Sequence, residues 1–287
     1  MTIGLYAIPI MGGQNLAKLG RRMDFLHRKH IKVIEKVRFW RLAMKVIFVG
    51  GCHLVGKPHG LSCGFVRLLW KRWRKINRNL HFDLIPYSVD WKSLLDSVKE
   101  ALAHRPDLII INTQAGLVLP TWDRTLVRLG LRPKQEIDEL RDNWAKTLVW
   151  QPKDKGKFYW QIKSLGILIL GGHRENWNSI ETLWQELSEE IEQAMVPVII
   201  MTPTPARGEY FVRGVENLER FREMVLRYAS CYRVCDVYPE LKALNLDALW
   251  IDGQHLSKKG HMVVGDRLWH SIQEVEGEEK WLQSDNF

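Results

Sequence analysis

Two short segments of the chain carry residue types that could form a nucleophile and its base. The first, GGCHLVG at residues 50–56, places the thiol of Cys52 in a glycine-flanked turn directly after an apolar run. The second, IDGQHLSKKGH at residues 251–261, holds Asp252 and His255 three positions apart. A carboxylate can orient an imidazole, and an imidazole can accept the proton of a thiol. The pair is common by chance, so the surrounding elements must decide whether it matters.

Those elements predict an α/β fold with a parallel sheet covered by helices on both faces. From residue 45 onward, short β-branched runs alternate with longer helical stretches. In such sheets the chemistry lies beyond the carboxyl ends of the strands, and Cys52 directly follows the first expected strand. We expect strands at residues 45–49, 81–86, 107–112, 196–202 and 232–237, and helices at residues 91–104, 180–194, 216–229 and 257–275.

The composition is that of a globular protein, with 287 residues of which 46% are hydrophobic and 26% charged. No apolar run approaches the ~20 residues of a membrane-spanning helix, and no basic segment precedes an apolar run as in a secretory signal. We therefore expect a cytoplasmic protein without a membrane span. The four cysteines are too few for a disulfide scaffold, and Cys231 and Cys235 have no second pair at zinc-ligand spacing. We expect reduced thiols, no metal and no cofactor.

Positive charge is concentrated at the amino-terminal end. Residues 1–79 contain 17 Lys or Arg and two acidic residues, which gives +15 and leaves −6 for the remainder of the net +9. Apolar residues at steps of three and four predict a basic amphipathic helical extension at residues 1–44, followed by an α/β domain at residues 45–287. The basic region is either a packed helix with a solvated face or a dock for an acidic partner. No nucleic-acid-binding motif is present, so nucleic acid is not the expected partner.

Several segments, in one order, resemble the SGNH or GDSL hydrolase superfamily. That family has Gly-Asp-Ser-Leu-Thr-x-Gly directly after its first strand, and residues 50–56 match this spacing with Cys52 where the serine belongs. Its last block, Asp-x-x-His followed by Leu-Ser-x-x-Gly-His, is reproduced by residues 252–261. Residues 105–111 and 196–205 resemble two further strands of the family. The resemblance runs from about residue 45 to 272 and implies a three-layer, flavodoxin-like fold of the SGNH-hydrolase type.

The resemblance also implies a chemistry, which is acyl transfer or hydrolysis of a thioester or ester through a Cys-His-Asp triad. Cys52 would be the nucleophile, His255 the general base and then general acid, and Asp252 the residue that orients the imidazole. A thiolate exchanges readily with another thioester, so coenzyme A or carrier-protein acyl groups are suitable donors. The acidic surface of an acyl carrier protein would complement residues 1–79.

The chain departs from the family pattern around the expected oxyanion hole. Gly51 replaces the aspartate that precedes the nucleophile, and residues 86–90 lack the glycine of the second block, which leaves Ser88 as a backbone candidate. The third block normally offers an asparagine, and here Asn112 and Gln114 are both candidate amide donors.

A segment at about residues 117–177 is longer than the usual connection of the family and rich in aromatic residues. We interpret it as an insertion that either forms a lid-like wall of the substrate site or packs a small subdomain. Residues 60–64, GLSCG, fit the Gly-x-Ser-x-Gly elbow of α/β-hydrolases, but no strand precedes them, so Ser62 is not the expected nucleophile.

Three other functions stay open on the sequence alone. The chain could be an ordinary ester hydrolase with an unusual nucleophile. It could be a catalytically silent SGNH-like binding protein, because the second and third blocks are altered. It could also be a binder of nucleic acid or an anionic surface, with the α/β body as scaffold.

Overall fold

The fold is described from a computed structural model that covers residues 44–57, 59–87, 90–120, 125–126, 129–131, 156–170, 176–208, 210–211, 213–249 and 252–282. All of these residues belong to one unit, Ala43–Phe287. The predicted helical extension lies outside the described residues, apart from Met44. Ser88 and most of the predicted insertion also lie outside them.

The centre of the fold is a five-stranded, all-parallel sheet with the order β2-β1-β3-β4-β5. The middle strands are rich in β-branched residues and buried on both faces, as parallel strands covered by helices must be. The connections from β1 to β2 and from β2 to β3 lead to opposite sides of β1, which creates a topological switch point beside it. The strands are β1 (Met44–Gly50), β2 (Leu80–Pro86), β3 (Leu108–Asn112), β4 (Val198–Met201) and β5 (Arg233–Cys235).

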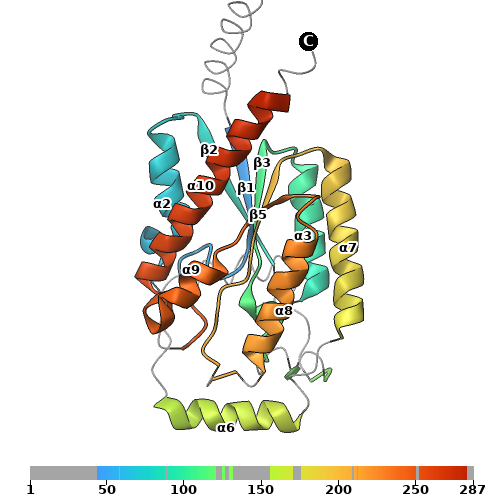
Figure 1. The fold of residues 1–287 in the computed structure, drawn as a ribbon, viewed down its shortest axis with the longest axis vertical. Coiled ribbons are helices and arrows are strands. Elements are labelled where there is room, and N and C mark those ends of the chain that lie inside the picture. Colours follow the sequence, from blue (N-terminus) through green and yellow to red (C-terminus); the bar gives the residue numbers. More distant parts are fainter. Residues whose placement is uncertain are drawn as a thin grey trace, which may run out of the picture. The chain divides into compact units, whose positions relative to one another are not determined.

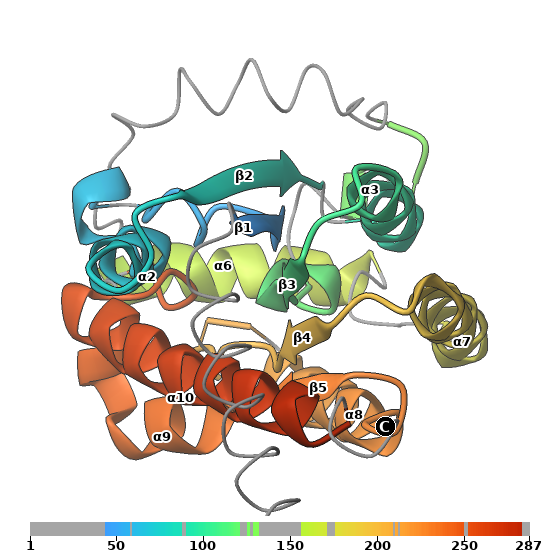
Figure 2. The same ribbon diagram turned by 90° about the horizontal axis from the view of Figure 1, so that it is seen from above.

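Helices cover both faces of this sheet (Figures 1 and 2). One face carries α3 (Trp91–Ala103), α7 (Trp177–Ala194) and α8 (Gly214–Arg227). The other carries α2 (Phe65–Arg74), α9 (Tyr238–Ala243) and α10 (Lys258–Leu282), while α6 (Gly156–Ile169) lies across the carboxyl ends of the strands. The short turns are η1 (Leu61–Cys63), η2 (Ala115–Leu117) and η3 (Asn245–Ala248). The predicted three-layer, flavodoxin-like α/β fold is confirmed.

The main core lies between the sheet and α3, α7 and α8. Alternate strand residues such as Ile47 and Ile109 point into it. Trp91 and Trp184 both pack edge-on against Phe221. Their ring centroids lie 4.9 and 5.6 Å, respectively, from the centroid of the Phe221 ring. These large aromatic side chains bury more apolar area than any other residue type, so they dominate the stability of this layer.

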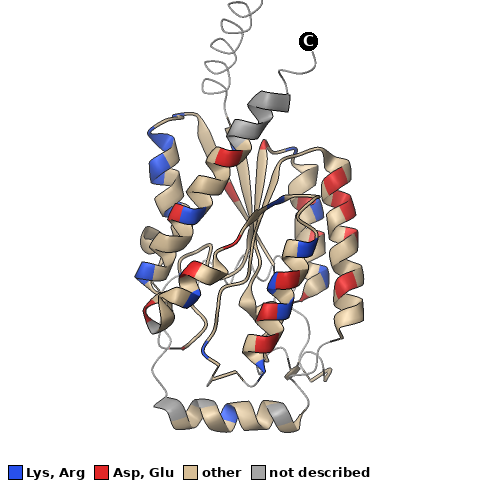
Figure 3. Cartoon of the chain, viewed as in Figure 1, with Lys and Arg blue, Asp and Glu red and all other residues tan. Residues whose placement is uncertain are grey.

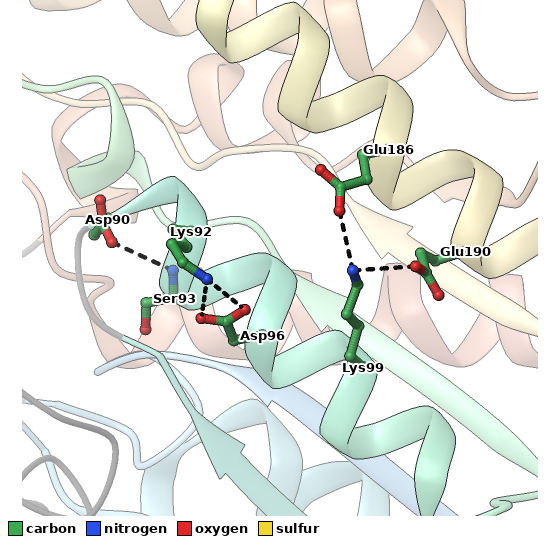
Figure 4. A network of polar contacts seen from close by, with 7 residues as sticks. All are labelled: Asp90, Lys92, Ser93, Asp96, Lys99, Glu186 and Glu190. Carbon is green, nitrogen blue, oxygen red and sulfur yellow. Dashed lines mark hydrogen bonds and ion pairs between the residues drawn. The ribbon is translucent and has the colours of Figure 1, made fainter.

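Charged residues on the surface tie α3 to α7 (Figure 4). The ammonium group of Lys99 lies 3.0 Å from Glu186 and 3.1 Å from Glu190, one turn apart on α7. At the start of α3, the carboxylate of Asp90 accepts the backbone N–H of Ser93 and caps the helix. Because the Lys99 cluster is open to water and screened, it aligns the two helices more than it stabilises them.

Candidate active site

The nucleophile candidate lies in a tight turn at the carboxyl end of β1. The backbone N–H groups of Leu54 and Lys57 donate to the carbonyls of Gly51 and Cys52, at 3.0 and 3.2 Å. Gly56 has a φ of +71°, and a Cβ there would lie 2.3 Å from the carbonyl oxygen of Gly60. Glycine is therefore required at this position, which explains the glycine that closes the first motif. The turn leaves the side chain of Cys52 partly exposed.

The second motif folds into a loop that leads into α10. The backbone N–H groups of Gln254 and His255 both donate to the same carboxylate oxygen of Asp252, at 3.1 and 3.0 Å. The hydroxyl of Ser257 accepts the N–H of Gly260 and so caps α10. A Cβ on Gly260 would lie 2.3 Å from the carbonyl oxygen of Ala248, which explains the Leu-Ser-x-x-Gly pattern.

These two segments meet at Cys52, His255 and Asp252. The Nδ1 atom of His255 lies 2.6 Å from the second carboxylate oxygen of Asp252, and both side chains are buried. The imidazole of His255 also lies close enough to the thiol of Cys52 to lower the pKa of that thiol. The three side chains therefore form a continuous line from carboxylate to imidazole to sulfur.

Electrostatics in this line favour the ionised pair of thiolate and imidazolium. Burial raises the pKa of Cys52, but the charge and hydrogen bond of His255, with a contribution from Lys57, bring it below the ordinary value. Burial lowers the pKa of His255, but the charge of Cys52 and the hydrogen bond to Asp252 raise it well above the ordinary value. Burial also raises the pKa of Asp252, and its bonds to His255 and Gln254 outweigh this and lower it.

His53 is adjacent to Cys52 in sequence, but its ring serves a different purpose. Its Nε2 atom lies 3.2 Å from the carbonyl oxygen of Gln254, so the neutral ring donates to the loop that carries Asp252 and His255. Burial, followed by the positive charges of His255 and His261, lowers the pKa of His53 to about 3. An imidazole this weakly basic is a poor proton acceptor at neutral pH.

Gln114 lies directly beside the nucleophile turn. Its carboxamide occupies the space next to Gly51, where an added Cβ would be only 1.9 Å from its Cδ and Oε1 atoms. The side chain donates to the carbonyl oxygen of Tyr87 at 3.3 Å, and the hydroxyl of Tyr87 accepts the backbone N–H of Gln114 at 2.9 Å. The same hydroxyl donates to the carbonyl oxygen of Asn112 at 2.7 Å. Tyr87 therefore holds the end of β3 in place, and sequence reasoning did not identify this role.

The other oxyanion candidates are placed differently. The side chain of Asn112 is fully buried, and neither of its amide atoms has a hydrogen-bond partner among the described residues. Ser88 lies outside the described residues. No carbonyl among the described residues accepts the backbone N–H of Cys52, which leaves that donor available at the end of β1.

The remaining thiols and Ser62 lie in other environments. Cys235 is buried at the end of β5, where burial raises its pKa to about 12. The thiols of Cys63 and Cys231 each lie within 3.8 Å of a neighbouring serine hydroxyl. Ser62 is exposed in the turn η1, which does not follow a strand.

Two further features bear on ligands. Among the described residues, no three His, Cys, Asp or Glu side chains are arranged to hold a metal ion. A pocket of about 260 Å³ lies beside the loop that carries Asp252, with Arg207, Lys242 and Leu249 in its wall. Its wall joins that loop through the N–H of Arg207, which donates to the carbonyl oxygen of Gly253 at 2.9 Å.

No helix in the described part of the chain has the length and apolar character needed to cross a membrane.

Neither a protein family model nor a curated protein sequence matches this chain. Solved structures do. The acetylxylan esterase Axe2 from Geobacillus stearothermophilus superposes with a TM-score of 0.51 at 17% identity, over 81% of this chain and 95% of that one. The acetyl xylan esterase AlAXEase gives 0.51 at 13% identity, over 80% and 100%.

A third solved structure is LAE5, an α/β-hydrolase enzyme from the metagenome of Lake Arreo, Spain. It gives a TM-score of 0.50 at 14% identity, over 81% of this chain and 96% of that one. These identities are low, so the likeness concerns the path of the backbone. The chain therefore has the three-layer fold of these esterases and hydrolases, with the five-stranded parallel sheet expected for the SGNH type.

Proposed function

We propose that this chain is an SGNH-type acyl hydrolase or acyl transferase that uses Cys52 as its nucleophile. The observation that carries the proposal is the line from Asp252 through His255 to Cys52 at the carboxyl end of β1. The pKa directions along this line favour a thiolate beside an imidazolium. The shared fold with acetylxylan esterases supports acyl chemistry at this edge of the sheet.

In the first half of the reaction, the thiolate of Cys52 attacks the acyl carbonyl and its π electrons move onto the oxygen. The tetrahedral intermediate collapses to a thioester on Cys52, and His255 gives its proton to the departing alkoxide or thiolate. In the second half, neutral His255 takes a proton from water or another acceptor, which attacks the thioester. Collapse of the second intermediate releases the thiolate and regenerates the ion pair with His255.

The oxyanion that forms in each half needs hydrogen-bond donors. We assign the backbone N–H of Cys52 and the side-chain N–H of Gln114 to this role, because both lie at the carboxyl ends of adjacent central strands. Where the family has an aspartate and an asparagine, this chain has Gly51 and a glutamine, and the longer amide crosses the space that glycine leaves open. Asn112 is the less suitable donor, because its amide is buried beneath the strand end.

The substrate is an acyl ester or thioester, and the thiol nucleophile favours a thioester. Exchange between a substrate thioester and Cys52 replaces one carbon–sulfur bond by another, so the acyl enzyme forms without a large change in bond energy. Burial of His255 and Asp252 excludes water from the base, which strengthens their interaction with the nucleophile.

A basic face on α2 is the proposed contact for an acidic carrier protein. Arg67 and Arg74 stack on the ring of Trp70, with guanidinium carbons 4.1 and 4.6 Å from its centroid. Six basic residues lie between positions 67 and 78. All six are among the described residues, and of these Arg72 alone forms an ion pair, with Asp266 at 2.7 Å. The other positive side chains are exposed and available to an anionic surface. The remainder of residues 1–79 lies largely outside the described part.

The test of the proposed chemistry is intact-mass analysis after incubation with acetyl-coenzyme A and, separately, with p-nitrophenyl acetate. We expect a single acetyl adduct on the wild type and on Cys63→Ala, and none on Cys52→Ala. Peptide mapping should place the adduct on Cys52. An adduct that persists in Cys52→Ala, or that maps to Ser62 or Cys63, contradicts the assignment.

A further inference from the structure

The helix α6 carries a stripe of apolar residues on its outer side. Phe158, Ile162, Leu165 and Ile169 follow each other at steps of four, three and four, which places them on one stripe of the helix. Their exposed fractions are 74%, 55%, 55% and 76%. A helix at the surface of a soluble domain normally turns such a stripe toward the core, and α6 does the opposite.

The inner face of α6 shows that this orientation is held by contacts. The hydroxyl of Ser164 donates to the carbonyl oxygen of Tyr210 at 2.6 Å, and the side chain of Ile167 is buried. At 100° per residue, Ser164 and Ile167 lie roughly opposite the outward stripe. The helix is therefore seated on the loop after β4 with its most apolar face turned to solvent.

The position of α6 gives this apolar stripe a functional setting. Figure 1 shows α6 lying across the carboxyl ends of the strands, the edge at which Cys52 is found. The carbonyl oxygen of Tyr210 accepts the hydrogen bond from Ser164. Tyr210 precedes the amino terminus of α8 and so belongs to the loops at this edge of the sheet. Whatever covers the stripe therefore lies next to the candidate active site.

Two loops at the same edge carry more basic than acidic residues. The loop at residues 51–64 contains Lys57 and no acidic residue, and in residues 202–213 the side chains of Arg207 and Arg213 outnumber a single glutamate. The sequence of α6 includes two lysines and no acidic residue, and Figure 3 shows no acidic colour on its described part. An exposed apolar stripe framed by cations is the pattern of a helix that lies in the plane of an anionic lipid surface.

We propose that α6 docks this protein onto an anionic phospholipid surface, with the stripe Phe158, Ile162, Leu165 and Ile169 in the headgroup region. A second copy of the chain is a weaker occupant. A stable protein interface takes about 20–30 residues from each side. The stripe and its exposed neighbours Tyr159 and Leu170 supply only six. Lipid binding needs no such area, because each inserted side chain and each nearby cation adds to it independently.

The experiment is flotation of the full chain with vesicles of phosphatidylcholine alone and of phosphatidylcholine mixed equally with phosphatidylglycerol. The test variant is Ile162→Gln with Leu165→Gln, because glutamine removes the apolar surface and keeps helix propensity. The control is Met195→Gln. Met195 is 91% exposed and lies just before β4, at the opposite edge of the sheet.

We expect the wild type and Met195→Gln to bind the anionic vesicles, and the double variant to bind them roughly tenfold more weakly or worse. High salt and neutral vesicles should each weaken binding of the wild type. Circular dichroism verifies that the double variant is folded. Cys52→Ala should bind as the wild type does, so a failure of the proposed chemistry would leave this result unchanged.

Three results would overturn the docking proposal. The first is a wild type that does not float with anionic vesicles, or that floats equally with neutral ones. The second is a folded double variant that binds like the wild type. The third is a wild-type dimer in size-exclusion chromatography with light scattering that becomes a monomer in the double variant, because a second copy would then cover the stripe.

Discussion

The side chain of Gln114 occupies the place that a side chain on residue 51 would need. A Cβ built on Gly51 lies 1.9 Å from the carboxamide carbon of Gln114, well inside any permitted contact. The two residues are therefore interlocked across the carboxyl ends of β1 and β3. Residue 51 cannot gain a side chain unless the side chain of Gln114 moves or is shortened, and this dependence gives the first test of the oxyanion assignment.

Gly51→Ala should displace the amide of Gln114 and lower kcat by roughly 10²–10³-fold, the usual loss for one oxyanion donor, with little change in KM. Steady-state kinetics with a soluble thioester measures this. Gly51→Ala combined with Gln114→Asn should recover part of the loss, because the shorter side chain removes the collision. The control is Gly265→Ala, since a Cβ there meets nothing nearer than 3.7 Å. Equal kcat in Gly51→Ala and the wild type would argue against a role for Gln114.

Alkylation of Cys52 by iodoacetamide should report its lowered pKa. Because His255 favours the thiolate, the rate should rise with pH at values below the ~8.5 of an ordinary thiol. In His255→Ala the burial remains and the favourable partner is lost, so the same rise should shift above the ordinary value. Mass spectrometry of the Cys52 peptide at a series of pH values makes the comparison. Cys235 is the internal control, since burial raises its pKa to about 12 and it should stay unmodified. Identical titrations in both proteins would contradict the ion pair.

Tyr87→Phe should act on the site through Gln114. It removes a buried hydroxyl that accepts one N–H and donates to one carbonyl, which costs about 1–3 kcal/mol of unfolding free energy. Tyr232 makes the same two types of bond, with Trp184 and Val225, so Tyr232→Phe is a matched control for stability.

Both tyrosine variants should lose similar stability in denaturant unfolding. Only Tyr87→Phe should also lower kcat/KM, by roughly tenfold to a hundredfold, because a small displacement of a donor weakens it strongly. An equal effect of both variants on kcat/KM would show that Tyr87 is structural only.

Neutralising Arg67, Arg74 and Arg78 with glutamine should separate carrier docking from chemistry. Arg72 is retained because it pairs with Asp266 of α10. If α2 meets an acidic carrier protein, kcat/KM should fall for a carrier-bound thioester and stay constant for a small soluble one. Raised salt should imitate the variant, since exposed charges are screened beyond roughly 8 Å at physiological ionic strength. An unchanged ratio between the two substrates would remove the docking surface.

The sheet and most helices could be predicted from sequence because their local signals agree with their burial. The β-branched runs became β1 to β5, and the glycines of both motifs stand where a Cβ would collide, at Gly56 and Gly260. The contact between the side chains of Asp252 and His255 could be predicted because one short loop carries both residues.

Other features depend on packing that no local pattern reveals. The sequence left Asn112 and Gln114 equivalent as donors, since both lie at the end of β3. The open space at Gly51 and the burial of Asn112 distinguish them. Tyr87 was missed because its partners are backbone groups more than twenty positions away. The helix α6 was not predicted, although its apolar residues recur at helical spacing. The spacing alone would also have indicated a buried face, whereas the structure shows that face exposed.

The direction of β1 and α10 has a practical consequence for handling the protein. β1 begins and α10 ends at the edge of the sheet opposite α6 (Figure 1). The seven residues of β1 separate that edge from the turn of Cys52. At ~3.3 Å per residue, this distance is roughly 20 Å. A tag or fusion partner joined after α10 therefore emerges away from the thiol of Cys52. Immobilisation through such a tag would present Cys52 and α6 toward the bulk solution, the orientation that surface-based binding assays require.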